Sequence, residues 1–277
     1  MYGRMMSMDN YIISKQYFAF NVWDIDSAQA VMDAAQGAKR DIILQTSAKV
    51  YSAIPRKQFR EFVTSYTRNM DINVWLHLDH CKNVELIEDA VDNGWDIVMV
   101  DASDKNINEN IEITNQITKY AHSKNVMVEA EVGQVGGIED NIRENIARRE
   151  DISKFVKETE IDFIAVAFGN VHGMYQEEPQ LQYDLIEYTA NITSLPFVVH
   201  GASGMSDKIL VKLLQYENVK KINISTDIKR AYRQGIQNAY QNGAFQEEDF
   251  QAVCIERYIY SAIVEMTKKK LRLLDRS

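Results

Sequence analysis

The segment VWLHLDH, residues 74–80, is a short and almost continuously apolar run that ends in an aspartate and a histidine. Seven further runs rich in Val, Ile, Phe and Leu are spread along the chain: YFAFNVW (17–23), DIILQTS (41–47), DIVMVDAS (96–103), VMVEAEV (126–132), FIAVAFG (163–169), FVVHGAS (197–203) and KINIST (221–226). Most of them do not alternate between apolar and polar residues, which is typical of parallel strands covered on both faces. We therefore expect eight buried parallel strands.

Helical patterns separate these runs, for example at 26–39, 83–94 and 107–124, and Gly94 stands where a helix C-cap is expected. Eight alternations of strand and helix predict an α/β fold of the (β/α)8 TIM-barrel type. The alternative is a doubly wound sheet, but its first strand-to-helix turn favours a glycine-rich loop, and FNVWDIDSA has no glycine. Because no linker interrupts the pattern, we expect one domain over 1–277. Its barrel would span about 17–244, with an appended C-terminal helical segment at about 245–277.

Charge and composition narrow the class of protein. The chain has 277 residues and a formal net charge of −9, which argues against a nucleic-acid or anionic-membrane partner. Two cysteines cannot form a disulfide framework, and no apolar run approaches the roughly 18 residues that a membrane span needs. The first residues contain no apolar stretch typical of a signal peptide. We therefore expect a cytoplasmic protein.

Polar side chains gather where the predicted strands end, which is the face that carries the active site in a barrel of this kind. Four of the five histidines fall in or near these strands, and His122 on a helical pattern is expected at the surface. Three histidines with an open position can form a catalytic zinc site, although a histidine near a strand end is often structural. The strand-end residues are Asp79, His80, Asp101, Ser103, Glu129, Glu131, His172, His200, Asn223, Ser225, Thr226 and Asp227.

One geometric condition applies to Asp79 and His80. They are neighbours in the sequence, so in a regular strand their side chains point to opposite faces. Both can reach one site only if the strand ends or kinks there.

Five ordered motifs now support a family resemblance: HLDHC, VEAEVGQVGGIED, AVAFGNVHGMY, VVHGASG and KINISTD. In this order they resemble the class II, metal-dependent fructose-bisphosphate and tagatose-bisphosphate aldolases, over roughly residues 17–240. The resemblance implies a lyase that reversibly cleaves a ketose 1-phosphate or ketose 1,6-bisphosphate. The products would be dihydroxyacetone phosphate and an aldehyde, formed through a zinc-stabilised enediolate.

The resemblance also implies roles for individual residues. Asp79 matches the acid/base residue, and Glu139 matches a mobile-loop glutamate that handles the proton on the ketose-phosphate carbon. The zinc ligands would be His80, His172 and His200, and Asp101 and Glu131 match acidic positions that hold the metal in an alternative place. Residues that match the cradle for the dihydroxyacetone phosphate group are Gly173, Gly201, Ala202, Ser203, Asn223, Ile224, Ser225 and Thr226.

The family pattern implies further partners of the chain. The expected cofactor is one Zn²⁺ ion. A monovalent cation near the phosphate site is a candidate for an additional ion. The expected partners are a small sugar phosphate and a second copy of the chain, in a homodimer or homotetramer.

Three other functions compete with this interpretation. A metal-free aldolase needs a Schiff-base lysine, and the predicted strands contain only Lys221, which the pattern places at the amino end of its strand. A barrel metallohydrolase usually has a His-x-His pair on its first strand, which FNVWDID lacks. A non-catalytic subunit of an aldolase assembly should have lost ligands, but Asp79 and the three candidate ligands are present.

The identity of the aldehyde depends on the C-terminal segment. Family members that act on bisphosphates usually carry a Pro-Arg pair at the start of the last helix, where the arginine binds the distal phosphate. Residues 245–258 read FQEEDFQAVCIERY, with no proline and no arginine before Arg257. Lys229 holds a position often occupied by arginine, and Ser225 replaces the aspartate typical of fructose-bisphosphate enzymes. We therefore expect a substrate whose far end is neutral or carries another charge.

Overall fold

The computed structural model describes residues 12–137, 145–246 and 252–276. Eight parallel strands close into a barrel in the order β1-β10-β9-β7-β5-β4-β3-β2. The strands are β1 Tyr17–Asn21, β2 Ile42–Ser47, β3 Val74–Cys81, β4 Ile97–Val100, β5 Met127–Val132, β7 Phe163–Val166, β9 Phe197–Val199 and β10 Val219–Ile224. Each overlaps one of the eight apolar runs of the sequence, so the predicted TIM barrel is confirmed.

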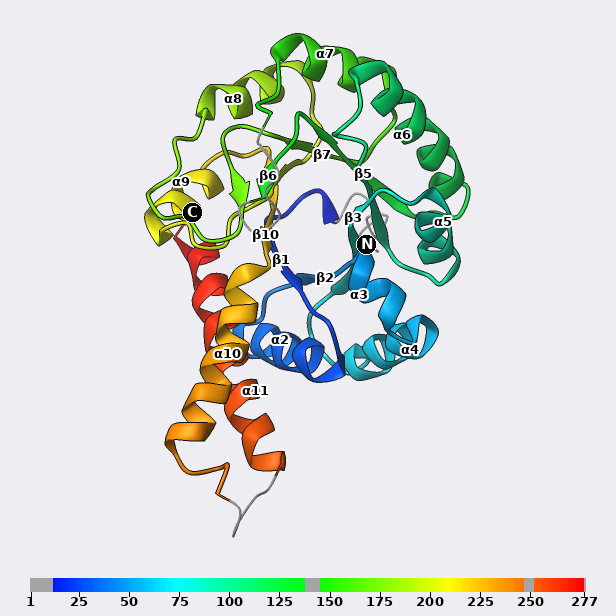
Figure 1. Ribbon diagram of the computed structural model, residues 1–277. Helices are drawn as coiled ribbons and strands as arrows, with labels where there is room; N and C mark the ends of the chain where they lie inside the picture. The colour runs from blue at the N-terminus through cyan, green and yellow to red at the C-terminus, as the bar shows by residue number, and fades with distance from the viewer. Residues whose placement is uncertain (1–11, 138–144, 247–251, 277) are drawn as a thin grey trace, which may run out of the picture.

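Helices surround the barrel, as Figure 1 shows. Asp24, Asn83 and Asn106 cap the helices that follow β1, β3 and β4 through side-chain oxygens that accept backbone N–H groups. Gly94, just after α5, has a φ of +77°, as the C-cap prediction requires. The helices are α2 Ile25–Ala38, α3 Ala48–Ala53, α4 Arg56–Thr67, α5 Val84–Asp92, α6 Ile107–His122, α7 Arg149–Glu158, α8 Tyr183–Ile192, α9 Asp207–Leu214, α10 Thr226–Gln241 and α11 Ala252–Leu271, followed by the 3-10 turn η2 Arg272–Asp275.

The interior of the barrel is apolar at the amino-terminal half of its strands. Side chains from seven strands form one buried cluster there with Ile12: Tyr17, Ala19, Ile43, Trp75, Ile97, Met127, Phe163, Ala165 and Val198. Above it the interior becomes polar, because the next inward-facing positions are residues such as Gln45, His77 and Glu129, each fully buried. The apolar half therefore supports a polar half that opens at the carboxyl ends of the strands.

The C-terminal segment is helical, as predicted. Helix α11 packs along α10 and also contacts α2. The approach is closest at Gly235 of α10, where an added Cβ would lie 2.4 Å from the Cα of Ile259. One end of this helix pair extends beyond the ring of helices (Figure 1).

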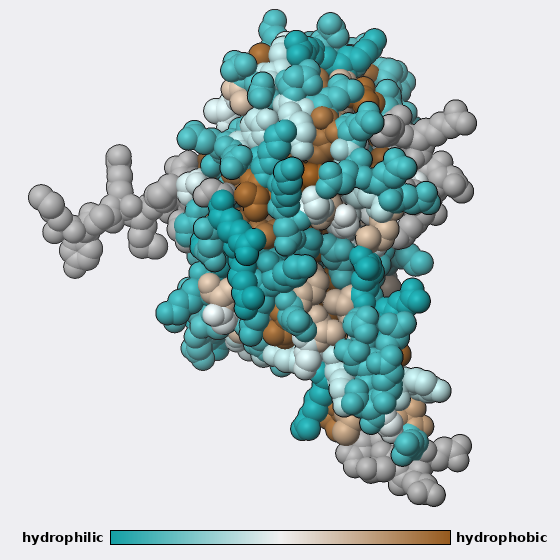
Figure 2. All heavy atoms as spheres, turned by 90° about the vertical axis from the view of Figure 1, so that its left-hand side faces the viewer, coloured by the Kyte–Doolittle hydropathy of each residue, from teal (hydrophilic) through white to brown (hydrophobic). Residues whose placement is uncertain are grey.

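Large apolar side chains are exposed near that projecting end. Tyr240, Phe245 and Val253 are 73%, 41% and 58% exposed. In Figure 2 the projecting end carries hydrophobic side chains, while hydrophilic residues cover most of the same face. Among the described residues, no helix combines the length and the apolar character needed to cross a membrane.

Candidate active site

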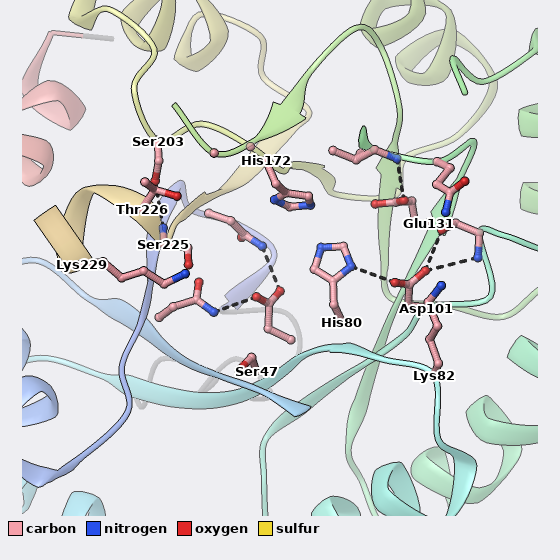
Figure 3. A pocket seen from close by; sticks show the side chains of 18 residues that line it. Ser47, His80, Lys82, Asp101, Glu131, His172, Ser203, Ser225, Thr226 and Lys229 are labelled. Atoms are coloured by element: carbon pink, nitrogen blue, oxygen red, sulfur yellow. Dashed lines mark hydrogen bonds and ion pairs between the residues drawn. The ribbon is translucent and has the colours of Figure 1, made fainter. Parts of the chain in front are cut away.

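A pocket opens at the carboxyl ends of the barrel strands (Figure 3). All eight barrel strands, or the segments directly after them, contribute to it. Its lining residues are Asn21, Ser47, Asp79, His80, Lys82, Asp101, Ser103, Glu131, Gln134, Val135, His172, Gly173, Gly201, Ser203, Asn223, Ser225, Thr226 and Lys229. Most of the predicted strand-end residues therefore line one pocket, whereas Glu129, His200 and Asp227 do not line it.

Three histidines form a cluster at this pocket, of which His80 and His172 line it and His200 is buried. His80 comes from β3, His172 from the short strand β8 (Val171–His172), and His200 directly follows β9. One ligand atom of each lies within 4.8 Å of the others. His80 is the central ring, with its centroid 4.9 Å from that of His172 and 4.5 Å from that of His200. This is a compact arrangement that could hold one metal ion.

Backbone geometry at the end of β3 brings Asp79 and His80 to the same pocket. His80 has a φ of +45°, the left-handed region that non-glycine residues rarely adopt. At the same place the pairing of β3 with β4 shifts register between Leu78 and Cys81. The strand therefore kinks at this point. Such a kink is what the side chains of Asp79 and His80 need in order to reach one site.

The ring nitrogens of two histidines are oriented by carboxylates. His80 Nδ1 lies 3.1 Å from Asp101 Oδ2, and His200 Nε2 lies 2.8 Å from Glu129 Oε1. The opposite nitrogens are both buried: His80 Nε2 has no hydrogen-bond partner, and His200 Nδ1 lies 3.0 Å from Glu131 Oε2. A buried imidazole that is held through one ring nitrogen by a carboxylate is the arrangement that metal-binding histidines adopt. The residues present therefore fit a metal ion.

The electrostatics of the cluster also favour a cation. Burial lowers the pKa of His80, but the hydrogen bond to Asp101 and the charges of Asp79 and Glu131 outweigh it and raise this pKa to about 10. Burial, together with the neighbouring His80 and His200, lowers the pKa of His172 to about 3. The carboxylates thus hold positive charge in the site, while His172 stays a neutral ring that can donate a lone pair.

Asp79 is held between two amides above the polar half of the barrel. Its Oδ2 accepts a hydrogen bond from Asn21 Nδ2 at 2.8 Å, and its Oδ1 accepts one from Asn223 Nδ2 at 3.3 Å. Burial raises the pKa of Asp79, but the positive charges of His80, His77 and Lys221 lower it to about 2. The side chain is therefore a fixed carboxylate that lines the pocket and can accept a proton.

Opposite the acidic side, the start of α10 offers a place for an anion. The Ser203 hydroxyl accepts hydrogen bonds from the backbone N–H groups of Ser225 and Asp227, at 3.0 and 3.3 Å. This ties the segment after β9 to the N-terminus of α10, where helix geometry favours negative charge. Of the residues predicted for a phosphate cradle, Ala202 and Ile224 are fully buried and do not line the pocket. Any contact from these two must come from their backbones.

Gly201 allows the β8 segment to approach β9. Its φ is +66°, and an added Cβ would lie 2.3 Å from the backbone oxygen of Val171, the residue before His172. Strand β8 itself is held by pairing with β6 (Gly136–Gly137). A side chain at position 201 must therefore displace the segment that carries His172.

We expect Gly201→Ala to lower turnover at this pocket about 100-fold, because a shift of about 1 Å in a positioned group has an effect of this size. Gly94→Ala is the matched control, since φ is +77° there but the nearest atom is 3.9 Å from an added Cβ. It should lose roughly 1 kcal/mol of stability through backbone strain and keep its activity. Equal activity of the two variants would show that the close approach at Gly201 does not position the site.

Two predicted features fall outside the described residues. Glu139 lies in the segment 138–144, and the acidic residues Glu247, Glu248 and Asp249 lie in 247–251. His122, expected at the surface, is at the end of α6 with a side chain that is 38% exposed.

Lys221 requires a correction. The sequence pattern placed it at the amino end of its strand, away from the site, but it lies fully buried inside the barrel. Its Nζ is 2.6 Å from Glu129 Oε2 and 3.1 Å from His77 Nδ1. Because β10 is not adjacent to β5 or β3 in the barrel, these contacts cross the interior.

A period of two along each strand could have placed His77 and Lys221 with Glu129, which was already among the predicted strand-end residues. His77, Glu129 and Lys221 each precede by two positions a residue that was assigned to the site, and residues two apart face the same side of a strand. Asn21 and Ser47 were also missed, although they end the first two strands as the identified residues end the others.

Comparisons with known proteins agree with this geometry. A family model described as fructose-bisphosphate aldolase class-II matches residues 13–277. The 6-phospho-5-dehydro-2-deoxy-D-gluconate aldolase of Bacillus licheniformis is 33% identical over 260 residues, which cover 91% of this chain and 87% of the relative. The fructose-bisphosphate aldolase of Staphylococcus epidermidis is 34% identical over 229 residues, 80% of each chain. The crystal structure of the YdjI aldolase from Escherichia coli K12 superposes with a TM-score of 0.80 at 28% identity, covering 96% of this chain and 94% of that one.

A closed (β/α)8 barrel with a polar pocket at the carboxyl ends of its strands defines an enzyme of the TIM-barrel class. The chain belongs to the class II fructose-bisphosphate aldolase family, whose members are lyases. The family resemblance predicted from the five motifs is therefore confirmed.

Proposed function

We propose that this protein is a metal-dependent aldolase that reversibly cleaves a ketose 1-phosphate into dihydroxyacetone phosphate and an aldehyde. One observation carries the proposal. His80, His172 and the carboxylate of Asp79 line the same pocket, beside the anion-favouring start of α10, and one ligand atom of His200 lies within 4.8 Å of a ligand atom of each of the other two histidines. Bond cleavage, charge stabilisation and phosphate binding can thus occur on one small molecule.

The histidines His80, His172 and His200 would hold the ion, with Asp101 and Glu131 beside them as alternative ligands. A divalent cation there would act as a Lewis acid that stabilises the negative charge developing on the ketose oxygens. Zinc is the expected ion because a three-histidine set is typical of catalytic zinc.

Asp79 would accept the proton of the C4 hydroxyl group when the C3–C4 bond breaks, and return it in the condensation direction. The two amides of Asn21 and Asn223 fix its orientation, so its free lone pairs face the pocket. A positioned acid/base of this kind contributes about 10²–10⁴-fold. Glu139 would exchange the proton on the ketose-phosphate carbon, a role that rests on the family motif alone.

The phosphate group would bind between the segment after β9 and the start of α10. Backbone N–H groups near Gly201, Ser203 and Thr226 would donate to it, and Lys229, which also lines the pocket, would add positive charge. A monovalent cation near this phosphate remains part of the proposal.

A Schiff-base mechanism is disfavoured by the position of Lys221. Its ammonium is bound by Glu129 and His77, and the residue is fully buried without lining the pocket. A Schiff-base lysine has to reach the carbonyl carbon of the substrate. Two other lysines line the pocket: Lys82, which follows the end of β3, and Lys229, which follows the end of β10.

We further propose that the far end of the substrate is neutral or carries a charge other than phosphate. Within the described residues, Lys82 and Lys229 are the only lysine or arginine side chains that line the pocket. Lys82 Nζ already pairs with Asp104 Oδ2 at 3.0 Å. The relatives are named for both a bisphosphate and a phosphorylated gluconate derivative, so the family tolerates different far ends. The alternative is a bisphosphate bound with an arginine of a neighbouring subunit.

The substrate proposal predicts the order of kcat/KM values across a panel of substrates, because discrimination is by transition-state binding. We expect ketose 1-phosphates with a neutral or carboxylate end to exceed fructose 1,6-bisphosphate by at least tenfold, about 1.4 kcal/mol. The measurement is dihydroxyacetone phosphate release under identical metal loading. A tenfold preference for fructose or tagatose 1,6-bisphosphate would contradict the substrate proposal and leave the aldolase proposal intact.

The quaternary structure is also a proposal. The exposed apolar residues at the end of the α10–α11 pair support a homodimer or homotetramer. We also propose that residues 1–277 act as one aldolase domain in the cytoplasm.

A further inference from the structure

A buried charged cluster lies beneath the candidate metal site and outside the pocket. Lys221, Glu129 and His77 are fully buried, and none of them lines the pocket. The Lys221 ammonium lies 2.6 Å from Glu129 Oε2 and donates to His77 Nδ1 at 3.1 Å. Buried charges are costly even when paired, and apolar residues of similar size often replace them without loss of stability. Folding alone therefore gives no reason for this cluster.

Glu129 connects the cluster to the metal site. One of its oxygens, Oε2, is bound by Lys221, and the other, Oε1, lies 2.8 Å from His200 Nε2. Because a carboxylate held by an ammonium accepts hydrogen bonds, His200 must carry a proton on Nε2. In a neutral ring the lone pair is then on Nδ1, which lies 3.0 Å from Glu131 Oε2, an oxygen of one of the proposed alternative metal ligands.

His80 and His200, the two histidines with carboxylate partners, present different ring nitrogens to the proposed metal ion. His80 is held through Nδ1 by Asp101, which leaves its Nε2 unpartnered (Figure 3). His200 is held through Nε2 by Glu129, and its Nδ1 faces the acidic side of the metal site, 3.0 Å from Glu131 Oε2. A wrong tautomer of His200 would aim an N–H group at the ion and remove one ligand.

We propose that Glu129, fixed by Lys221, is a positioning residue that sets the tautomer and ring orientation of His200 so that Nδ1 faces the metal. This inference rests on the proposed function, because it assumes that the three histidines bind the ion. Groups that orient a metal-binding histidine typically change metal affinity 10–100-fold. Lys221 acts one step further away, since it keeps the Glu129 carboxylate charged and oriented.

The test uses a double variant that removes both buried charges, Glu129→Leu with Lys221→Met, and should therefore fold. We expect its Zn²⁺ affinity, measured by competition with a chromophoric chelator, to fall about 10–100-fold. The absorption spectrum of the Co²⁺-loaded protein should change, and nitrogen NMR of His200 should show loss of the Nε2-protonated tautomer. Circular dichroism and the melting temperature report whether the fold is kept.

The single variant Glu129→Gln adds a second measurement. Its amide oxygen can accept from either Lys221 or His200 but its NH₂ group then opposes the other, so affinity should also fall. His122→Gln is the matched control, because His122 Nε2 makes the same kind of contact with a carboxylate, 2.9 Å from Asp162 Oδ2, at the exterior of the barrel. It should leave metal affinity and the Co²⁺ spectrum unchanged.

The outcomes separate this inference from the proposed function. A folded double variant with wild-type affinity and an unchanged Co²⁺ spectrum would overturn the role of Glu129. Unchanged metal binding in His172→Ala would instead overturn the three-histidine site, because His172 has no contact with Glu129 among the described interactions.

Discussion

Asp79→Ala is expected to lower kcat by about two to four orders of magnitude while leaving the metal content unchanged. The reason is that Asp79 lines the pocket between Asn21 and Asn223 and is the proposed acid/base residue, whose loss has an effect of this size. The measurement is kcat for dihydroxyacetone phosphate release, with metal content determined on the same sample.

Two variants serve as controls for this experiment. His80→Ala should lower metal occupancy, since His80 is the central ring of the cluster. Asp92→Ala removes an exposed carboxylate that pairs with Lys124 and should leave both quantities unchanged. If Asp79→Ala released the metal while His80→Ala retained it, the geometry inferred from the kink at the end of β3 would be wrong.

Removal of the metal is expected to abolish aldol cleavage, and Zn²⁺ or Co²⁺ should restore it. Without the ion, the site lacks the Lewis acid that would stabilise the charge left on the ketose oxygens, and Lys221 cannot take its place because it is buried beneath the site and held by Glu129. The measurement is activity after chelator treatment and dialysis, before and after metal is added back.

Borohydride trapping gives the corresponding negative control. No lysine adduct should form when the protein is treated with borohydride in the presence of substrate. Full activity of the metal-free protein, or a trapped adduct, would contradict a metal-dependent mechanism.

The barrel could be predicted because its strands are buried on both faces. Residues in β2 and β5, for example, are buried at nearly every position, so their sequences are continuously apolar or small except for the inward polar residues. The closure of the sheet and its strand order then follow from the alternation of strands and helices. The pattern did not predict the place of Lys221. It indicated where along its strand the residue lies, but not whether the side chain points into the barrel.

The site was predicted where polar residues end a strand and less well elsewhere. Asp79 and His80 were identified because they stand at the end of a predicted strand. The kink that brings both side chains to one pocket could not be predicted. It depends on a φ of +45° at His80, and a residue other than glycine gives no sign of such a backbone conformation. The contact between Glu129 and His200 joins positions 71 residues apart, so only the folded barrel reveals it. To predict a pair of this kind, one has to know both the order of the strands in the barrel and which side chains point inward.

The most direct test of the central claim is a crystal structure of the metal-loaded protein soaked with dihydroxyacetone phosphate, with the ion located by anomalous scattering. The account predicts a single strong peak within coordination distance of His80, His172 and His200, with the phosphate group at the start of α10. An active, metal-loaded protein whose ion lies away from these three histidines would contradict it.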